Sequence, residues 1–303
     1  MDGILVIDKP AGITSHDVVA RVRRVLKTKR VGHTGTLDPF ATGVLVVLVG
    51  RATRLAQFLD KDEKEYEALL RFGFETDTGD VTGMRSAECG MRSEEELADT
   101  LANTNWEGIL AAFRGEIEQV PPMYSAKKVA GKKLYEHARK GEVVDRPPIN
   151  INVHELEIVD DGELRTSHSA FRIRVVCSAG TYIRALAEDI GRAVGVGAHL
   201  AELRRTRAGR FELAQSITLD DLEKHPDPAG KLMAKETAVD HLPAIALNAD
   251  RAEKTRNGLS TRILEVGFAQ GEAVRMLDES GDLLAVGFYD QAESSIRPKV
   301  VLV

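Results

Sequence analysis

The chain has 303 residues, of which 43% are hydrophobic and 29% are charged, and its formal net charge at pH 7 is −6. These values are typical of a globular protein and argue against a disordered or fibrous chain, and the length allows one large and one small domain. The two cysteines, Cys89 and Cys177, lie far apart, which argues against a disulfide framework or a thiolate metal site and favours a reducing, cytoplasmic location.

The sequence predicts no membrane partner but leaves a nucleic-acid partner open. Its apolar runs are too short to span a bilayer, and no basic lead that would suggest a signal peptide precedes the first of them. Residues 211–303 contain 10 basic and 16 acidic side chains, whereas residues 1–58 contain 9 basic and 4 acidic ones. A local basic face can bind phosphates whatever the total charge, so the acidic total does not exclude RNA or DNA.

The first predicted elements are a short strand and a basic helix. Residues 3–7 form a buried apolar run that ends in the turn residues 8–12. Thr14 or Ser15 can cap the helix that follows. One face of this helix carries six cations and no acid: Arg21, Arg23, Arg24, Lys27, Lys29 and Arg30. Because like charges repel along a helix, we favour phosphate contact over the ordinary alternative of a solvated face.

The stretch Gly32-His33-Thr34-Gly35-Thr36-Leu37-Asp38-Pro39-Phe40-Ala41-Thr42-Gly43 is the most distinctive part of the chain. Three glycines, a proline and several hydroxyls are incompatible with a regular helix or a central strand. We expect a rigid polar loop that presents one carboxylate, Asp38, at the edge of a sheet. Judged on its Asp-Pro dipeptide alone, an ordinary turn is the more economical reading.

Residues 44–72 continue with elements that surround this loop. Residues 44–49 are six consecutive apolar side chains, which predict a buried strand, and residues 52–59 read as an amphipathic helix. Residues 65–72 predict a second strand that contains Tyr66, and a polar loop with Asp80 follows. Taken by itself, Tyr66 is an ordinary half-buried strand aromatic.

The middle of the chain predicts two helices, an extended segment and a lysine-rich block. The helices cover residues 93–101, with Ser93 as the cap, and residues 106–113. Residues 119–126 are stiffened by two prolines, and residues 134–140 read as a helix. This block is a second candidate phosphate surface, carried by Lys127, Lys128, Lys132, Lys133, Arg139 and Lys140.

Two strands, residues 149–159 and 170–177, lead into a glycine-containing turn and a helix whose first turn contains Arg184. An exposed helical arginine is the ordinary reading of that residue. Residues 199–207 supply further cations. A Pro-rich loop at residues 226–230 marks a plausible domain edge, after which residues 262–266, 273–277 and 283–288 read as short strands.

Three of these blocks resemble the TruB family of tRNA pseudouridine synthases. The stretch around Asp38 is similar to the catalytic motif of that family, and the blocks around Tyr66 and Arg184 resemble further motifs in the same order, over about residues 3–211. The resemblance implies that Asp38 is the nucleophile and that Arg184 pairs with it. It also implies that Tyr66 packs against the target base and has been considered as a base.

The same resemblance assigns five binding positions. It implies that His33 contacts RNA near the displaced base, that Tyr182 and Leu203 line the base pocket, and that Lys9 lies near the active site. Asp80 corresponds to a family aspartate that helps to order the site.

The family implies an α+β fold: a mixed, largely antiparallel sheet with flanking helices, followed by a small β-rich domain. We expect the boundary between residues 1–235 and 236–303, and the second part resembles an RNA-binding PUA domain only loosely. The implied activity is isomerisation of uridine 55 in the T-loop of tRNA, with the T-stem-loop as partner and a monomeric enzyme. The acidic balance of residues 211–303 argues against strong phosphate binding by the C-terminal part.

The chemistry of this reaction needs a nucleophile, a dry pocket and a proton shuttle, and we expect no metal and no cofactor. The sequence contains no phosphate-binding glycine loop, no HExxH and no Cys/His cluster. Attack at C6 of the base and attack at C1′ of the sugar both stay open. The alternatives are a non-catalytic tRNA-binding or tRNA-folding module, which needs the basic surfaces but not Asp38, and an aspartyl hydrolase, which would be expected to show a second acid or metal ligands nearby.

Overall fold

The computed structural model describes residues 1–86, 93–125, 127–129, 131–138, 140–142, 144–159, 169–263 and 267–302. The first half of the chain contains β1 Gly3–Lys9, α1 Ser15–Val25, β2 Val31–Thr34, β3 Thr42–Val49, η1 Gly50–Leu55, α2 Ala56–Leu59, β4 Lys64–Phe72, α3 Glu94–Ala102, α4 Trp106–Ala111, β5 Gly115–Gln119, β6 Lys128–Val129, β7 Lys132–Lys133 and α5 Leu134–Ala138. The second half contains β8 Ile149–Ile158, β9 Ala170–Cys177, α6 Ile183–Val194, β10 Ala198–Ala208, β11 Phe211–Glu212, η3 Leu213–Gln215, β12 Ile217–Thr218, α7 Leu219–Lys224, η4 Ala229–Lys231, η5 Lys235–Ala238, β13 Ala244–Ala246, α8 Ala249–Arg256, β14 Thr261–Arg262, β15 Ala273–Leu277, β16 Leu283–Asp290 and β17 Ser295–Val301.

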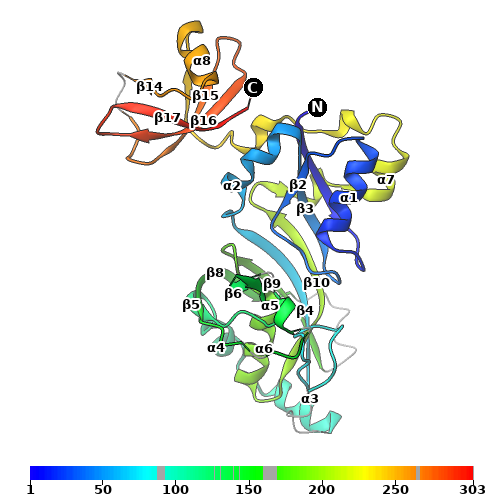
Figure 1. The fold of residues 1–303 in the computed structure, drawn as a ribbon. Coiled ribbons are helices and arrows are strands. Elements are labelled where there is room, and N and C mark those ends of the chain that lie inside the picture. The colour runs from blue at the N-terminus through cyan, green and yellow to red at the C-terminus, as the bar shows by residue number, and fades with distance from the viewer. Residues whose placement is uncertain are drawn as a thin grey trace.

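One long sheet organises the molecule. Its strand order is β12-β1-β3-β10-β4-β9-β8-β5, with β2 added to β3 and β11 added to β10. Only the pairs β1–β12 and β3–β10 are parallel, and the other described pairs of this sheet are antiparallel. This mixed, largely antiparallel sheet with helices packed against it confirms the predicted α+β class (Figure 1).

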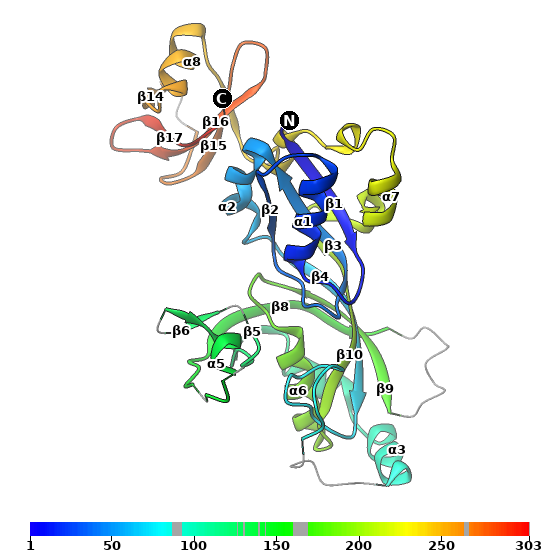
Figure 2. The same ribbon diagram turned by 45° about the vertical axis from the view of Figure 1, so that its right-hand side comes forward.

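The strands β4 and β10 connect two halves of the molecule. In both views they run from the region of β1, β2 and β3 into the region of β8, β9 and α6 (Figures 1 and 2). Burial along β4 alternates over most of its length, as expected for a strand with one face in the core. Lys64 and Tyr66 therefore lie on the same face of β4, two residues apart.

The apolar run at residues 44–49 is buried on both faces of the sheet. Leu45 and Val47 belong to the larger core on the side of α1, whereas Val44 and Val46 belong to a second core on the opposite side. A strand covered on both sides needs no polar alternation, which explains why β3 is continuously hydrophobic.

A second sheet, of order β13-β15-β16-β17-β14, forms the C-terminal part. It contacts the first sheet through the second core, to which Val286 and Leu302 contribute together with Val44 and Val46. The Arg51 Nη1 atom donates to the Leu302 carbonyl at 3.2 Å across the same junction. Figure 1 shows this sheet beside α2 at one end of the molecule.

Most predicted helices and strands are present, and several boundaries differ. Thr14 caps α1 and Ser93 caps α3, each through a reciprocal capping box. Residues 52–59 do not form one amphipathic helix, because the segment begins as the 3₁₀ turn η1 and only its last four residues, α2, are α-helical. The helix predicted at residues 134–140 ends at Ala138.

The distinctive twelve-residue stretch is shorter as a loop than predicted. Residues 32–34 belong to β2, an edge strand paired only with β3, and residues 42–43 already belong to β3. The loop proper is therefore residues 35–41, and it contains Asp38. In the part of the chain that the structure describes, no helix is long and apolar enough to cross a membrane.

Candidate active site

Several buried groups hold the loop that carries Asp38. The Lys9 side chain is 0% exposed, and its ammonium donates to the carbonyls of Pro39 at 3.1 Å and Ala41 at 2.7 Å. The Ser15 hydroxyl donates to the Leu37 carbonyl and accepts from the Leu37 N–H. The backbone on both sides of Asp38 is thus fixed by groups from β1 and α1.

Glycine is required where the loop enters β3. Gly43 has φ +99°, and a Cβ on it would lie 2.1 Å from the Arg205 carbonyl oxygen. Because β3 and β10 pair here in parallel, Gly43 opposite Arg205, a side chain at this position would force the two strands apart.

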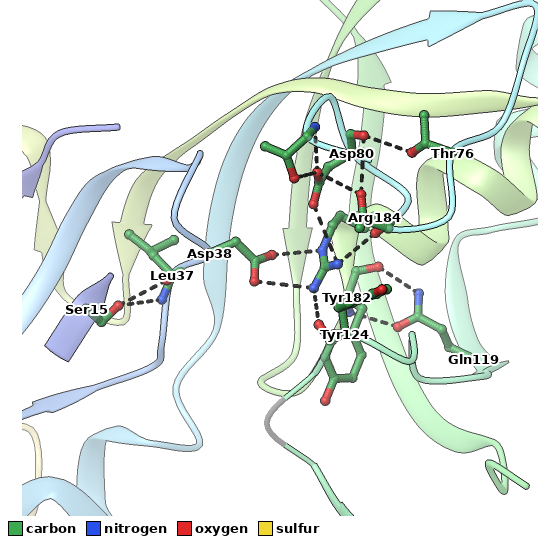
Figure 3. A network of polar contacts seen from close by, with 11 residues as sticks. Ser15, Leu37, Asp38, Thr76, Asp80, Gln119, Tyr124, Tyr182 and Arg184 are labelled. Atoms are coloured by element: carbon green, nitrogen blue, oxygen red, sulfur yellow. Dashed lines mark hydrogen bonds and ion pairs between the residues drawn. The ribbon is translucent and has the colours of Figure 1, made fainter. Parts of the chain in front are cut away.

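The Arg184 guanidinium, from the first turn of α6, faces Asp38. Its Nε lies 2.9 Å from Asp38 Oδ2, and its Nη2 lies 3.3 Å from Asp38 Oδ1. The remaining donors point to the carbonyls of Thr78 and Tyr124, each at 2.7 Å, and to Asp80 Oδ2 at 3.6 Å (Figure 3). Only 4% of the Arg184 side chain is exposed, so the exposed helical arginine that its sequence position suggests is wrong.

Asp80 is the second carboxylate of this network. Its side chain is 5% exposed and accepts from the hydroxyls of Thr78 and Thr82 and from the Thr82 N–H. It lies on the side of the guanidinium away from Asp38, as Figure 3 shows. Asp80 therefore fixes the arginine, whereas Asp38 remains the carboxylate that reaches open space.

The ionisation of Asp38 depends on two opposing effects. Burial raises the pKa of the Asp38 carboxyl above its ordinary value, and the Arg184 guanidinium opposes this rise by stabilising the carboxylate. About a third of the side chain, 35%, stays accessible. The arrangement leaves a carboxylate with one edge paired and the other edge available for reaction.

Asp38 opens into a cavity of about 270 Å³ between the two halves of the molecule. Five of the residues singled out from the sequence line it: Asp38, Tyr66, Tyr182, Arg184 and Leu203. They come from the loop after β2, from β4, from the N-terminal end of α6 and from β10. The volume is near the lower end of the range for small-molecule sites, about 300–1,000 Å³.

Tyr66 lies in this cavity as a neutral phenol. Its side chain is 9% exposed, and burial raises the pKa of the hydroxyl while a hydrogen bond from Arg205 lowers it. Arg205 is itself buried, and it donates to the carbonyls of Val44 at 2.7 Å and Gly35 at 2.8 Å. One buried arginine thus joins the Tyr66 hydroxyl to the loop that carries Asp38.

Sequence reasoning missed Lys64, Arg205 and Ser125, all of which line the cavity. Burial lowers the pKa of Lys64, whose ammonium donates to the carbonyls of residues 59, 60 and 62. A period of two along each strand was the available signal, because Lys64 precedes Tyr66 by two residues and Arg205 follows Leu203 by two.

Three of the five predicted binding residues, Lys9, His33 and Asp80, do not line the cavity. Lys9 is enclosed behind the loop, where burial lowers the pKa of its ammonium to about 8. His33 lies on β2 with its ring 5.4 Å from that of His16, and burial lowers the pKa of His33 to about 4. The His33 Nδ1 atom is buried and has no hydrogen-bond partner.

The basic face of α1 is partly neutralised. Arg21 donates to Glu223 at 2.7 Å and to Asp220 at 2.9 Å, and both acids lie in α7. Arg23 donates to the Val31 carbonyl. The pairing of Arg21 therefore corrects the prediction that all six cations are free to contact phosphate. Exposed cations remain at Arg24 in α1 and at Lys27, Lys29 and Arg30, which follow the end of the helix at Val25 and so do not lie on its face as predicted.

The lysine-rich block forms the hairpin β6–β7 and the helix α5. Arg139 and the side chains of Lys128 and Lys133 lie outside the described residues, as do Cys89 and the last part of the strand predicted at residues 262–266. Among the residues that are described, no three His, Cys, Asp or Glu side chains converge as metal ligands.

Comparison with known families gives two consecutive matches. Residues 23–183 match the model described as TruB family pseudouridylate synthase (N terminal domain), and residues 184–241 match the tRNA pseudouridylate synthase B C-terminal domain. Asp38 lies within the first matched segment, and Arg184 is the first residue of the second. Both matched segments therefore contribute residues to the cavity.

Individual proteins match over nearly the whole chain. A protein of Solibacter usitatus named tRNA pseudouridine synthase B is 44% identical over 297 residues, which cover 95% of each chain. A protein of Geobacillus thermodenitrificans with the same name is 43% identical and covers 87% of this chain and 86% of its own. Among solved structures, a chain of a Cbf5-Nop10-Gar1 complex has a TM-score of 0.71 and 29% identity, with coverage of 99% of this chain and 85% of that one.

Proposed function

The chain belongs to the TruB family of pseudouridylate synthases, and we propose that it isomerises uridine 55 in the T-loop of tRNA with Asp38 as the nucleophile. Pseudouridine synthases are isomerases: the N1–C1′ bond of uridine breaks, a C5–C1′ bond forms, a proton leaves C5 and N1 takes up a proton. The observation that carries the assignment of Asp38 is its carboxylate, held by Arg184 at the wall of a cavity that Tyr66 also lines.

The reaction begins with a base that has left its stack. A uridine inside a folded RNA loop cannot reach a carboxylate, so it must be flipped out at a cost of a few kcal/mol. Contact with Tyr66 offsets part of that cost, because stacking of a base on an aromatic ring contributes roughly 1–3 kcal/mol. Tyr182 and Leu203 enclose the base from α6 and β10.

Asp38 then attacks as a carboxylate. Attack at C1′ and attack at C6 place the same demand on the protein: an ionised oxygen aimed into the cavity, with its negative charge balanced by Arg184. Tyr66, whose hydroxyl has a raised pKa, serves the reaction as a neutral phenol that contacts the base. Lys9, which has no access to the cavity, acts by holding the Asp38 loop.

RNA binding is assigned to surfaces outside the cavity. His33 on β2, the exposed cations of α1 and of the turn that follows it, and the β6–β7 hairpin supply contacts to the T-stem-loop. We place the catalytic domain at residues 1–235 and a small C-terminal domain at residues 236–303, and we propose a monomer. A basic surface beside a deep pocket is the arrangement that base-flipping enzymes use.

The direct test is tritium release from tRNA in which uridine is labelled at C5. Asp38→Asn should lower the single-turnover rate by at least roughly 10³-fold, because it removes the nucleophile and keeps the shape of the side chain. Affinity for tRNA, measured by filter binding, should stay close to that of the unchanged protein. Full turnover by Asp38→Asn would contradict the assignment. Tight binding without product from the unchanged protein would favour a tRNA-folding module instead.

A further inference from the structure

Ser125 presents a buried hydroxyl with no hydrogen-bond partner to the catalytic cavity. Its side chain lines the cavity and is 5% exposed, and the Oγ atom has no partner in the structure. A hydroxyl buried without a partner costs about 1–3 kcal/mol, so most buried hydroxyls are bonded. A group left unsatisfied at a reaction cavity points to a ligand that completes it.

Hydrogen bonds to the beginning of α6 hold the backbone that leads to Ser125. The carbonyl of the preceding residue, Tyr124, accepts from Arg184 Nη2 at 2.7 Å, the same atom that contacts Asp38. At the start of the segment, the Gln119 side chain accepts from the Tyr182 N–H at 2.8 Å and donates to the Tyr182 carbonyl at 3.1 Å (Figure 3). Residues 119–124 are thus hydrogen-bonded at both ends to the beginning of α6.

The other serine of the cavity wall is already engaged. Ser178 lines the same cavity, but its Oγ accepts from the Asn152 N–H at 2.9 Å. The guanidinium of Arg184 has carbonyl or carboxylate partners for its donors, and the Lys64 ammonium is bonded to backbone carbonyls. Among the described side chains of the wall, Ser125 is therefore the one that carries a buried polar atom with no hydrogen-bond partner.

We propose that the Ser125 hydroxyl donates a hydrogen bond to a carbonyl oxygen of the uracil ring bound in this cavity. The proposal rests on the proposed function, since it names a contact to the base that Asp38 attacks. Uracil carries two carbonyl oxygens, O2 and O4, and a serine hydroxyl is a donor that rotates to suit its acceptor.

Such a contact is compatible with the turn that the base makes during isomerisation. When detached uracil turns over about the line through N3 and C6, C5 takes the place of N1 and the two carbonyls exchange positions. A hydroxyl that donates to one carbonyl before the turn therefore meets the other carbonyl afterwards. One fixed donor can hold the base in both orientations without leaving its own site.

The test combines a protein change with a substrate change. Single-turnover rates of tritium release are measured for the unchanged protein and for Ser125→Ala, on T-stem-loop RNAs that carry uridine, 2-thiouridine or 4-thiouridine at the target position. Sulfur is a weak acceptor, so one thio substitution removes the same hydrogen bond from the RNA side. A double-mutant cycle then isolates the contact.

Ser125→Ala should slow the uridine RNA about tenfold, which is the effect expected for one lost hydrogen bond. On one of the two thiouridine RNAs the variant and the unchanged protein should react at nearly equal rates. An unchanged rate on uridine RNA, or the same loss on all three RNAs, would overturn the proposal, the latter because it indicates a structural role.

Two controls keep the test decisive. Should Ser125→Ala fail to fold, Ser125→Cys carries the same comparison, because its S–H group is a weak donor of similar size. If the unchanged protein forms no product from uridine RNA, the proposed function fails. If it forms product and Ser125→Ala does so equally fast, only the role of Ser125 fails.

Discussion

At the scale of single residues, Arg184 determines the orientation and the charge balance of Asp38. Its guanidinium contacts two carboxylates and two backbone carbonyls from the Asp38 loop, the loop at residues 76–82 and the segment that ends at Ser125. A planar fork of five N–H donors suits this set, and a lysine ammonium with three donors does not. The residue therefore orients Asp38, the proposed nucleophile, and joins three segments distant in sequence.

The first prediction at this scale concerns Arg184→Lys. Losing the side-on contact to Asp38 should lower the single-turnover rate about 10- to 100-fold, as expected for hydrogen bonds to a charged group. Burial raises the pKa of Asp38 and the guanidinium lowers it, so the variant should raise this pKa further. Because the reaction needs the carboxylate, activity in the variant should disappear at a higher pH than in the unchanged protein as the solution is acidified.

Arg192→Lys is the matched control for this measurement. Arg192 lies on the same helix and pairs with Glu75 at 2.8 Å, but 56% of its side chain is exposed. Its replacement should leave both the rate and the acidic limb of the pH profile unchanged. An acidic limb that stays in place in Arg184→Lys would mean that the limb does not report on Asp38.

At the scale of elements, the packing of helices determines which cations are free to contact RNA. The helix α1 packs beside α7, and Arg21 is committed to Asp220 and Glu223 across that junction. Arg24 and Lys29 lie further along the chain, are exposed and form no salt bridge among the described contacts. The phosphate surface of α1 is therefore narrower than its sequence suggests.

The prediction for this element is a change in the salt dependence of RNA binding. Replacing Arg24 and Lys29 by glutamate should weaken T-stem-loop binding. It should also reduce the steepness of the slope of log affinity against log salt concentration by about one to two, because each phosphate contact releases counterions. The control reverses two exposed cations of the C-terminal sheet, Arg297 and Lys299 on β17. Equal salt slopes for all three proteins would mean that Arg24 and Lys29 belong to an ordinary solvated surface and do not contact RNA.

At the scale of the whole molecule, the two sheets share a core. Leu302 is 2% exposed and packs in the second core with Val286, Val44 and Val46. A ring contact between Phe58 and Phe288, with centroids 6.2 Å apart, lies on the same junction. A shared apolar core couples the stability of the parts that it joins, so the C-terminal sheet contributes to the stability of the strands that carry the Asp38 loop.

Leu302→Ala tests this coupling. The change should destabilise the protein by about 2–5 kcal/mol, as large-to-small substitutions in cores do. The only tryptophan, Trp106, lies in α4 at the far half, and its fluorescence should report the lower denaturant midpoint. Leu259→Ala, at a position that is 56% exposed, is the control. If the Trp106 transition did not move in Leu302→Ala, residues 236–303 would unfold as an independent domain.

Local patterns in the sequence predicted the elements and the identity of the reactive group. Cap residues predicted the starts of α1 and α3, the unbroken apolar run predicted β3, and the residues around Asp38 and Arg184 carried the family resemblance. These features depend on neighbours within a few residues, where the periodicity of helices and strands and the steric preferences of glycine and proline operate. The breakdown of residues 52–59 into a 3₁₀ turn shows where tertiary packing overrides such a pattern.

Only the tertiary structure decided which side chains face the cavity. Lys9 was expected near the active site and is enclosed behind the Asp38 loop, and Arg21 was expected to be free and is paired. Arg205 and Ser125 had no distinctive sequence signal, and the fold places both in the cavity wall. Each outcome depends on contacts between residues tens to hundreds of positions apart. The sequence by itself determined which carboxylate to propose as reactive and most of the strands around it, whereas long-range packing set the charge balance of Asp38 and completed the wall of its cavity, because burial and hydrogen-bond partners are properties of the assembled sheet.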